Sequence, residues 1–340
     1  MKENLKEVPL VSIVILCLND LIYLKHLIPQ LLEKTNYPNI EIIIIDNGSS
    51  DQLGLWINNN FKELKFLRYF HLPKNLGYAK GMNIGIKKAQ GKYIVLCNSD
   101  ILFPINWLKY MVIVAESDSN ILLIGILHVQ HNRRNQNLSI NPKIYFHESY
   151  AVNFGCILYR KNFSEEDKIG LFDRYFHSYY EDLDLIYRIH LQGYRIIKIL
   201  SSFVYHGRYL NSISKNKFES EFSSKMRARI FTRSRLYFTL KWESFILIIK
   251  EILLIKLTLI KTIFLSKDYL KLFGVVLGFF DILKDFPFIF SVRKEIKKKY
   301  PNFKSGMKRI KKMKKKTQTD LILKKEQYKR IIPLEKSIDL

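Results

Sequence analysis

Cysteine is scarce in this chain: Cys17, Cys97 and Cys156 are the only three in 340 residues, and they form no CxxC pair. Their wide spacing argues against a disulfide framework and against a cysteine-ligated metal site. Two of them lie in apolar runs that are typical of strands. We therefore interpret all three as buried thiols of a protein in a reducing compartment.

Long uninterrupted apolar runs are also missing. The run near the N-terminus, Leu10–Leu18, is shorter than the roughly 20 residues that span a bilayer, and no small-residue cleavage site follows it. A strand buried on both faces explains this run. The sequence therefore predicts a cytoplasmic protein.

Acidic residues are outnumbered, with 31 Asp and Glu against 56 Lys and Arg, and the net charge is +25. Much of the excess lies in residues 293–330, which hold seventeen basic and three acidic residues. Such a segment can bind nucleic acid, bind anionic lipid or only keep the protein soluble. It lacks the interleaved aromatic residues that nucleic-acid binding favours, and it follows apolar helices. We therefore expect an anionic membrane surface as partner, and no nucleic acid.

The hydrophobic content of 48% is enough to fill a sizeable core. Strand-like apolar runs alternate with segments of helical spacing, which indicates a largely parallel sheet with helices on both faces. The predicted strands are 11–18, 41–46, 66–70, 93–97, 153–159 and 195–200, and the predicted helices are 21–34, 78–90 and 182–192. The stretch 120–149 is less regular, and its polar segment 131–137 predicts an exposed loop.

The character of the chain changes after about residue 227. Two very apolar segments follow, 245–265 and 269–290, but both carry charges, which cost about 2.5–3.5 kcal/mol each at the centre of a spanning helix. We therefore predict amphipathic helices on the membrane surface; a helical pair packed on the main domain is the alternative. The expected division is a main domain of residues 1–240, membrane-associating helices at 241–292 and a polybasic tail at 293–340.

Three polar motifs follow predicted strands, which is where ligands bind in open α/β sheets. The segment 46–51, DNGSSD, can accept hydrogen bonds from a base or ribose, or it can form an Asx turn. The glycine-rich segment 75–85 can approach a nucleotide closely, or it can serve close helix–sheet packing. The segment 98–100, Asn-Ser-Asp, can hold a divalent cation on a diphosphate, or it can form a turn.

Carboxylates crowd the segment 181–184, just before a helical pattern. They can cap the helix or favour its dipole, but a carboxylate at a helix start that faces a cleft also suits a general base. His206 follows the last predicted strand. A lone histidine is usually structural, yet its place at a strand end allows a ligand role.

In this order and spacing, the motifs resemble those of family 2 glycosyltransferases, most closely the rhamnosyltransferase-like members of cell-surface polysaccharide synthesis. The resemblance covers residues 9–208 and continues weakly through 235–241. It includes the DNGSSD strand end, the NLGYAxGxNxGI loop, an N-x-D form of the metal motif, the FDxxFxxYxEDxDLxxRxxxxGYRI block and the later histidine. It implies an α/β fold of the GT-A nucleotide-diphospho-sugar transferase type.

The resemblance also implies a role for each matched residue. Asp182 would deprotonate the acceptor hydroxyl with support from Glu181 and Asp184, and Asp100 and His206 would hold a metal. The donor nucleotide would be bound by Asp46, Asn47, Asp51, Asn75, Gly77, Lys80, Asn83, Asn98 and Ser99. The implied cofactor is a divalent cation, Mg²⁺ or Mn²⁺, and Asn98 in place of the usual Asp leaves fewer carboxylates for it.

The implied reaction is an inverting transfer of a sugar from a nucleoside-diphosphate donor to a lipid-linked or growing cell-surface glycan. The donor is expected to be dTDP- or UDP-linked, with rhamnose as one candidate sugar. We expect a peripheral protein on the inner face of the cell membrane. The alternative hypothesis, suggested by Asn98, is a catalytically silent relative that acts as a scaffold in a polysaccharide assembly complex.

Overall fold

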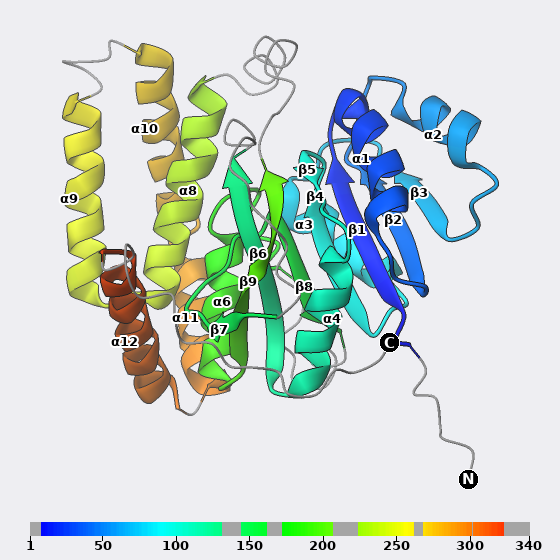
Figure 1. The fold of residues 1–340 in the computed structure, drawn as a ribbon. Coiled ribbons are helices and arrows are strands. Elements are labelled where there is room, and N and C mark those ends of the chain that lie inside the picture. Colours follow the sequence, from blue (N-terminus) through cyan, green and yellow to red (C-terminus); the bar gives the residue numbers. More distant parts are fainter. Residues whose placement is uncertain are drawn as a thin grey trace.

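The structure is a computed structural model, and it describes residues 8–130, 144–161, 172–206, 224–261, 268–300 and 302–322. The loop expected at 131–137 lies outside these residues. Figure 1 shows a central sheet with helices on both of its faces and a group of C-terminal helices standing to one side.

The strands of the sheet are β1 (Val11–Cys17), β2 (Ile40–Asp46), β3 (Leu67–His71), β4 (Tyr93–Asn98), β5 (Ile101–Leu102), β6 (Ile121–Gln130), β7 (Phe146–Glu148), β8 (Cys156–Arg160) and β9 (Arg195–His206). Their order is β3-β2-β1-β4-β8-β6-β9-β5, and β7 also pairs with β9. From β3 to β4 all neighbours are parallel, as predicted. The other half is mixed, because β8 runs antiparallel to both β4 and β6, and β5 and β7 run antiparallel to β9.

The first strands are buried on both faces, which is why they are almost purely apolar. Alternate side chains of one strand enter two different core clusters: Val14 belongs to one, and Ile13 and Ile15 belong to the other. Helices α1 (Leu21–Lys34) and α4 (Trp107–Ser117) cover the second cluster. Helices α3 (Tyr78–Lys88) and α6 (Glu181–Leu191) cover the first. The short helix α2 (Leu53–Phe61) lies beside β3.

The C-terminal helices are α8 (Ser224–Trp242), α9 (Phe245–Lys261), α10 (Tyr269–Lys284), α11 (Phe286–Lys299) and α12 (Phe303–Ile322). Pro287 stands in the first turn of α11, where proline is tolerated, and it accounts for the break after α10. Among the helices that the structure describes, none has both the length and the apolarity needed to cross a membrane.

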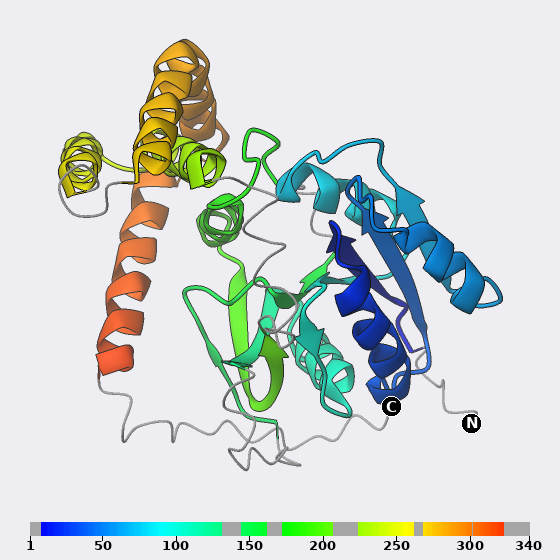
Figure 2. The same ribbon diagram turned by 90° about the horizontal axis from the view of Figure 1, so that it is seen from above.

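Helices α8 and α10 approach each other closely because α10 carries glycines at the contact. A Cβ atom on Gly278 would lie 2.6 Å from the main-chain oxygen of Arg229 in α8. The same two helices are joined by the Arg229 guanidinium, which donates from Nε and Nη2 to the two carboxylate oxygens of Asp281, each over 2.7 Å. Helix α9 stands apart from this pair (Figure 2), and several of its large apolar side chains are exposed.

Candidate active site

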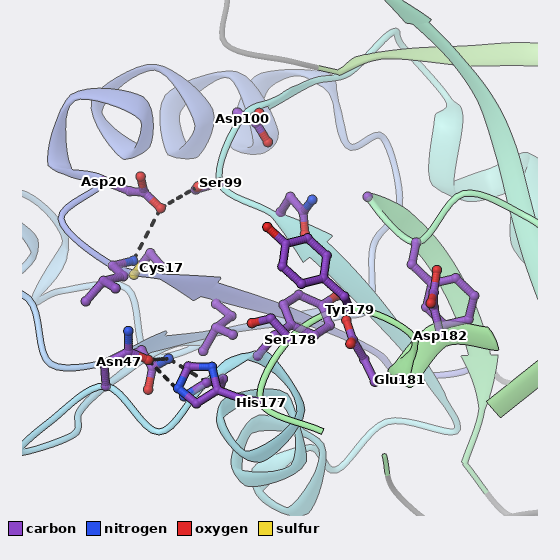
Figure 3. Close-up of a pocket in the computed structure, with 18 of the residues that line it drawn as sticks. Cys17, Asp20, Asn47, Ser99, Asp100, His177, Ser178, Tyr179, Glu181 and Asp182 are labelled. Carbon is purple, nitrogen blue, oxygen red and sulfur yellow. Dashed lines mark hydrogen bonds between the residues drawn. The ribbon is translucent and has the colours of Figure 1, made fainter. Parts of the chain in front are cut away.

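A cavity of about 530 Å³ opens at the carboxyl ends of β1, β2 and β4. Parallel strands end at the same edge of the sheet, so the segments that follow them meet here. The lining residues come from 16–20, 47, 75–78, 98–100, 153–155, 177–182, 206, 227 and 230. Figure 3 shows Ser99 and Asp100 on one side of this cavity and Glu181 and Asp182 on another.

Asp100 and His206 lie together at the wall of the cavity. The His206 Nε2 atom is 3.4 Å from Asp100 Oδ1 and 3.2 Å from Asn98 Nδ2. If the Asn98 amide donates to Nε2, that nitrogen is unprotonated and faces the Asp100 oxygen as a second electron-pair donor. A cation that binds both atoms would take the lone pair that Nε2 otherwise offers to the Asn98 amide.

A divalent cation therefore fits this wall, but with few protein ligands. Within the described parts of the chain, there is no group of three or more His, Cys, Asp or Glu side chains that could hold a metal ion. Mg²⁺ and similar hard cations often bind through one or two carboxylates and complete their shell with phosphate oxygens and water. Asp100 and His206, with Asn98 beside them, fit a cation that is held jointly with a diphosphate.

His128 contacts the His206 ring, and this contact was not predicted from the sequence. Its Nδ1 atom lies 3.1 Å from Nδ1 of His206. Burial and the neighbouring His206 lower the pKa of His128 to about 3, so His128 is neutral. One of the two Nδ1 atoms must carry the hydrogen; if it is that of His206, the unprotonated nitrogen of its ring is Nε2, which faces Asp100 and Asn98.

Asp46 lies beneath the cavity rather than on its surface. It is buried, and its carboxylate accepts hydrogen bonds from the Ser49 main-chain N–H and the Tyr69 hydroxyl. Burial opposes ionisation, but these hydrogen bonds and a contact with His71 outweigh it and lower the pKa of Asp46. Asp46 thus fixes the turn that presents the next residue, Asn47, to the cavity.

Asn47, Asn75 and Gly77 form one hydrogen-bonded corner of the site. The Asn47 Nδ2 atom donates to Asn75 Oδ1 over 3.0 Å, and Gly77 N–H donates to the same oxygen over 2.8 Å. Gly77 has a φ of +83°, and a Cβ there would lie 2.5 Å from the main-chain oxygen of His177. Only glycine fits this close approach of two loops.

The other predicted nucleotide residues have varied positions. Ser99 lines the cavity and donates to Asp20 Oδ2 over 2.7 Å. Asp51 accepts from the main-chain N–H of Leu21 over 2.8 Å at the start of α1. Asn83 is buried and donates to the main-chain oxygen of Phe172 over 2.8 Å, which fixes the loop before α6. Lys80 is exposed on α3 and does not line the cavity.

Glu181 and Asp182 line the cavity at the start of α6. Burial and then the adjacent Asp182 raise the pKa of Glu181 to about 8, and burial also raises the pKa of Asp182. The preceding residues, Tyr179 and Tyr180, both have left-handed backbone conformations, with φ of +70° and +68°. Consecutive left-handed tyrosines are strained, and such strain gathers at functional sites.

Asp184 points away from this cavity into a buried ion-pair cluster. Its carboxylate lies 3.0 Å from Arg188 Nε and 2.6 Å from Lys241 Nζ, and it accepts a hydrogen bond of 2.7 Å from the Trp242 indole. Asp184 therefore anchors α6 to the end of α8. Asp184 acts on the neighbouring carboxylates through the position of the helix and through its charge, which adds to the rise in the pKa of Glu181.

Several lining residues were missed by sequence reasoning. Asp20 follows β1 just as the predicted motifs follow β2 and β4, so its position at a strand end was a usable signal. His177 and Tyr179 belong to the block that carried the family resemblance. Arg227 belongs to α8, and no local pattern in the sequence indicates that this helix reaches the cavity.

Comparison with known proteins decides the family. A family model described as glycosyl transferase family 2 matches residues 12–180. This segment includes the carboxyl ends of β1, β2 and β4 and ends at Tyr180. The chain belongs to glycosyltransferase family 2. Within this family 2 chain, α6, β9 and all of the C-terminal helices lie beyond the matched segment.

Two curated relatives illustrate the similarity. This family 2 chain is 42% identical over 92 residues to an uncharacterised glycosyltransferase of Haemophilus influenzae, covering 27% of this chain and 36% of the relative. It is 31% identical over 115 residues to the glycosyltransferase GlyG of Streptococcus pneumoniae, covering 34% of this chain and 38% of GlyG. The chain thus spans little more than a third of the length of these two relatives.

Among solved structures, the chain is similar to the mannosyltransferase PcManGT from Pyrobaculum calidifontis, whose structure holds GDP-Man and Mn²⁺. The TM-score is 0.52 at 13% identity, over 94% of this chain and 89% of PcManGT. This likeness shows a shared fold, and the fold is the GT-A type that the sequence predicted.

Proposed function

We propose that this chain is an inverting glycosyltransferase that moves a sugar from a nucleoside-diphosphate donor to a hydroxyl of a glycan acceptor. The observation that carries the proposal is the content of one cavity. Asp100 and His206 offer a cation and diphosphate site, and Glu181, which is buried, and Asp182, which is partly buried, offer two carboxyl groups with raised pKa values. Transfer of a sugar from a nucleoside diphosphate to a hydroxyl uses a site for the diphosphate and a carboxylate that can accept the proton of the hydroxyl.

The donor is proposed to be UDP- or dTDP-linked, with a hexose or rhamnose as its sugar. The corner formed by Asn47, Asn75 and Gly77 would receive the nucleotide, and Asp100 and His206 would face its diphosphate. A divalent cation, Mg²⁺ or Mn²⁺, would when bound neutralise the charge that develops on the leaving diphosphate.

Asp182 is proposed as the general base. It accepts the proton of the acceptor hydroxyl while the hydroxyl oxygen attacks the anomeric carbon from the face opposite the diphosphate. The bond between that carbon and the diphosphate oxygen breaks, so the nucleoside diphosphate leaves and the configuration inverts. Because the pKa of Glu181 is raised to about 8, Glu181 is mostly protonated at neutral pH, and the base role falls to Asp182.

The acceptor is proposed to be a lipid-linked or growing cell-surface glycan, reached at the inner face of an anionic membrane. The support is the outward face of α9, where Ile246, Leu253 and Leu257 are 77%, 54% and 60% exposed. The exposed lysines of α11 and α12 lie nearby in the chain and match an anionic surface in charge. We accordingly keep residues 1–240 as the transferase domain, 241–292 as its membrane-associating helices and 293–340 as a polybasic tail.

The donor site is tested by thermal unfolding with UDP, dTDP, GDP and CMP, each with and without Mn²⁺ or Mg²⁺. A ligand at 100 times its dissociation constant stabilises a protein by about 2.7 kcal/mol. We expect a metal-dependent rise in Tm with UDP or dTDP that is lost in Asp100→Ala. The absence of any nucleotide effect in the wild-type protein would favour the silent scaffold instead.

The base is tested with Asp182→Asn. We expect the variant to keep the nucleotide-dependent rise in Tm and to lose about 10²–10⁴-fold in transfer rate, the usual contribution of a general base. Full activity in this variant would remove Asp182 from the mechanism while leaving the donor site intact.

The membrane surface is tested by flotation with anionic and with neutral vesicles. Leu253→Asp with Leu257→Asp should abolish flotation with anionic vesicles. Leu55→Asp is the control, because Leu55 is slightly more exposed, at 64%, but lies on α2 at the far side of the molecule. Equal flotation of all three proteins would contradict a docking role for α9.

A further inference from the structure

A second cavity lies beside the candidate active site, between the C-terminal helices. Its volume is about 550 Å³, within the usual range for small-molecule sites. It is bounded by α8, by Ile255 of α9 and by the first half of α10. None of the predicted motifs lines it, and the matched family segment contributes only Tyr179.

The polar part of this cavity is cationic. Arg227 and Lys271 line it, and neither forms an ion pair with any described residue. A carboxylate is also present, that of Asp268, but it is already engaged by the Ser224 hydroxyl at 3.2 Å and by the main-chain N–H of Lys271 at 2.9 Å, where it caps α10. A third cation, Arg235, pairs with Glu251. With that pair set aside and the charge of Asp268 counted, the lining has an excess of one positive charge, and Arg227 and Lys271 are the groups that can bind an anionic ligand.

The rest of the cavity is apolar. Phe231, Ile255 and Val275 line it from three different helices. Outside it, the first turns of α10 expose Leu270 and Phe273, so the apolar lining continues onto an exposed apolar surface. An anionic group with a long apolar chain matches this combination of charges and surface.

Two residues connect the second cavity with the candidate active site. Tyr179 and Arg227 line both cavities. Tyr179, which has a left-handed backbone conformation, makes an edge-to-face contact with Phe231 at the junction, with ring centroids 5.5 Å apart. A ligand in the second cavity can therefore extend past Tyr179 toward Asp182.

We propose that the acceptor is a saccharide linked to a lipid phosphate, and that the second cavity binds this phosphate. Arg227 and Lys271 bind the phosphate, the lipid chain leaves along the apolar surface of α10, and the saccharide passes Tyr179 to reach the base. This inference rests on the proposed glycosyl transfer and names the substrate class of its acceptor side.

The test uses dodecyl phosphate below its micellar concentration as a probe that combines the chain and the phosphate. Inorganic phosphate and dodecyl maltoside are the comparison ligands, since each carries only one of the two features. Binding is measured by titration calorimetry on the full chain. We expect saturable binding of dodecyl phosphate and much weaker binding of the other two.

The decisive variants are Lys271→Gln and Lys284→Gln. Both remove one lysine charge from the same helix, but Lys284 is exposed at the other end of α10 and does not line the cavity. Loss of one charge-assisted contact should weaken dodecyl phosphate binding about tenfold in Lys271→Gln, as in Arg227→Gln, and leave it unchanged in Lys284→Gln. Equal affinity of both lysine variants and the wild type would overturn the phosphate site. Equal binding of dodecyl maltoside would show an apolar surface only, and binding of inorganic phosphate alone would show a free-phosphate site.

The donor experiment separates this inference from the proposed function. Lys271→Gln should retain the metal-dependent rise in Tm with a nucleoside diphosphate. If nucleotide binding persists in the wild type and dodecyl phosphate does not bind, only the lipid-phosphate site is wrong. If neither ligand binds, the proposed glycosyl transfer fails together with it.

Discussion

The buried carboxyl group of Glu181 should make the protein less stable as the pH rises. The pKa of Glu181 is about 8 in the folded protein, against an ordinary value of 4.5, because burial disfavours its charged form. Between these two values the unfolded chain has lost the proton and the folded protein still holds it. The folded state therefore binds more protons than the unfolded state, and the free energy of unfolding falls as the pH rises through this window.

The magnitude follows from the size of the shift. One unit of pKa shift corresponds to about 1.4 kcal/mol, and at pH 5 the unfolded carboxyl is only partly ionised. Between pH 5 and pH 8 the titration of Glu181 should therefore lower the free energy of unfolding by roughly 3 kcal/mol. Glu181→Gln removes the titration but keeps the size and the neutral charge of the side chain. The variant should gain this amount relative to the wild type at pH 8.

The assay is urea unfolding of the wild type and Glu181→Gln at pH 5 and pH 8. All other groups titrate in both proteins and largely cancel in the comparison. Glu116→Gln is the control, because its carboxyl is partly buried but bonded to Lys92 and Tyr93, which lower its pKa, so the variant should show no gain at pH 8. If the difference between Glu181→Gln and the wild type were the same at both pH values, Glu181 would not be a protonated carboxyl in the native protein.

Two further predictions concern the packing of α8. Lys241→Met should lower the free energy of unfolding by about 3 kcal/mol, because it removes the buried cation that lies 2.7 Å from the Asp173 carboxylate and 2.6 Å from that of Asp184; Lys241 helps to lower the pKa of Asp173, so the loss, measured by urea unfolding, should shrink as the pH falls and Asp173 protonates. Gly278→Ala should lower stability by about 1–3 kcal/mol, since the new Cβ would press on the main-chain oxygen of Arg229 at 2.6 Å. A rise in Tm for this variant, as helix propensity alone would give, would argue against close contact between α8 and α10.

The parallel half of the sheet could be predicted because its strands are buried on both faces and therefore read as continuous apolar runs. The expected strands at 11–18, 41–46, 66–70 and 93–97 coincide with β1 to β4 to within one residue at each end. The stretch from 120 was expected to be irregular, yet it begins with the ten-residue strand β6. Residues 121–127 are apolar except for Gly125, which the close packing of Val152 requires, so this strand carries the same signal as β1 to β4. The register shifts on both sides of Leu123–Gly125 affect only its pairing with β9.

The location of the site could also be predicted, but not which side chains face the cavity. Asp182 and Asp184 are two positions apart on a helix, about 200° around its axis, so only one of them can face the cavity. The structure assigns that position to Asp182. Likewise, Asp46 and Asn47 are adjacent at a strand end, and Asn47 is the one that lines the cavity. Spacing within a motif identifies the site, whereas the direction of each side chain depends on the element that carries it.

The contribution of α8 could not be predicted, because it depends on contacts distant in sequence. Lys241 and Trp242 at the end of α8 bind the carboxylate of Asp184, which is one turn or less from Asp182 on α6. The other end of α8 carries Arg227, which lines both cavities. A single rigid helix therefore connects the carboxylate that would accept the acceptor's proton with the cation that would hold the acceptor's phosphate. Since a helix rises 1.5 Å per residue and bends little, the separation between these two groups is fixed by the fold. An acceptor whose reactive hydroxyl lies at another distance from its phosphate should bind in the second cavity without reaching Asp182, so the length of the saccharide would be selected by α8.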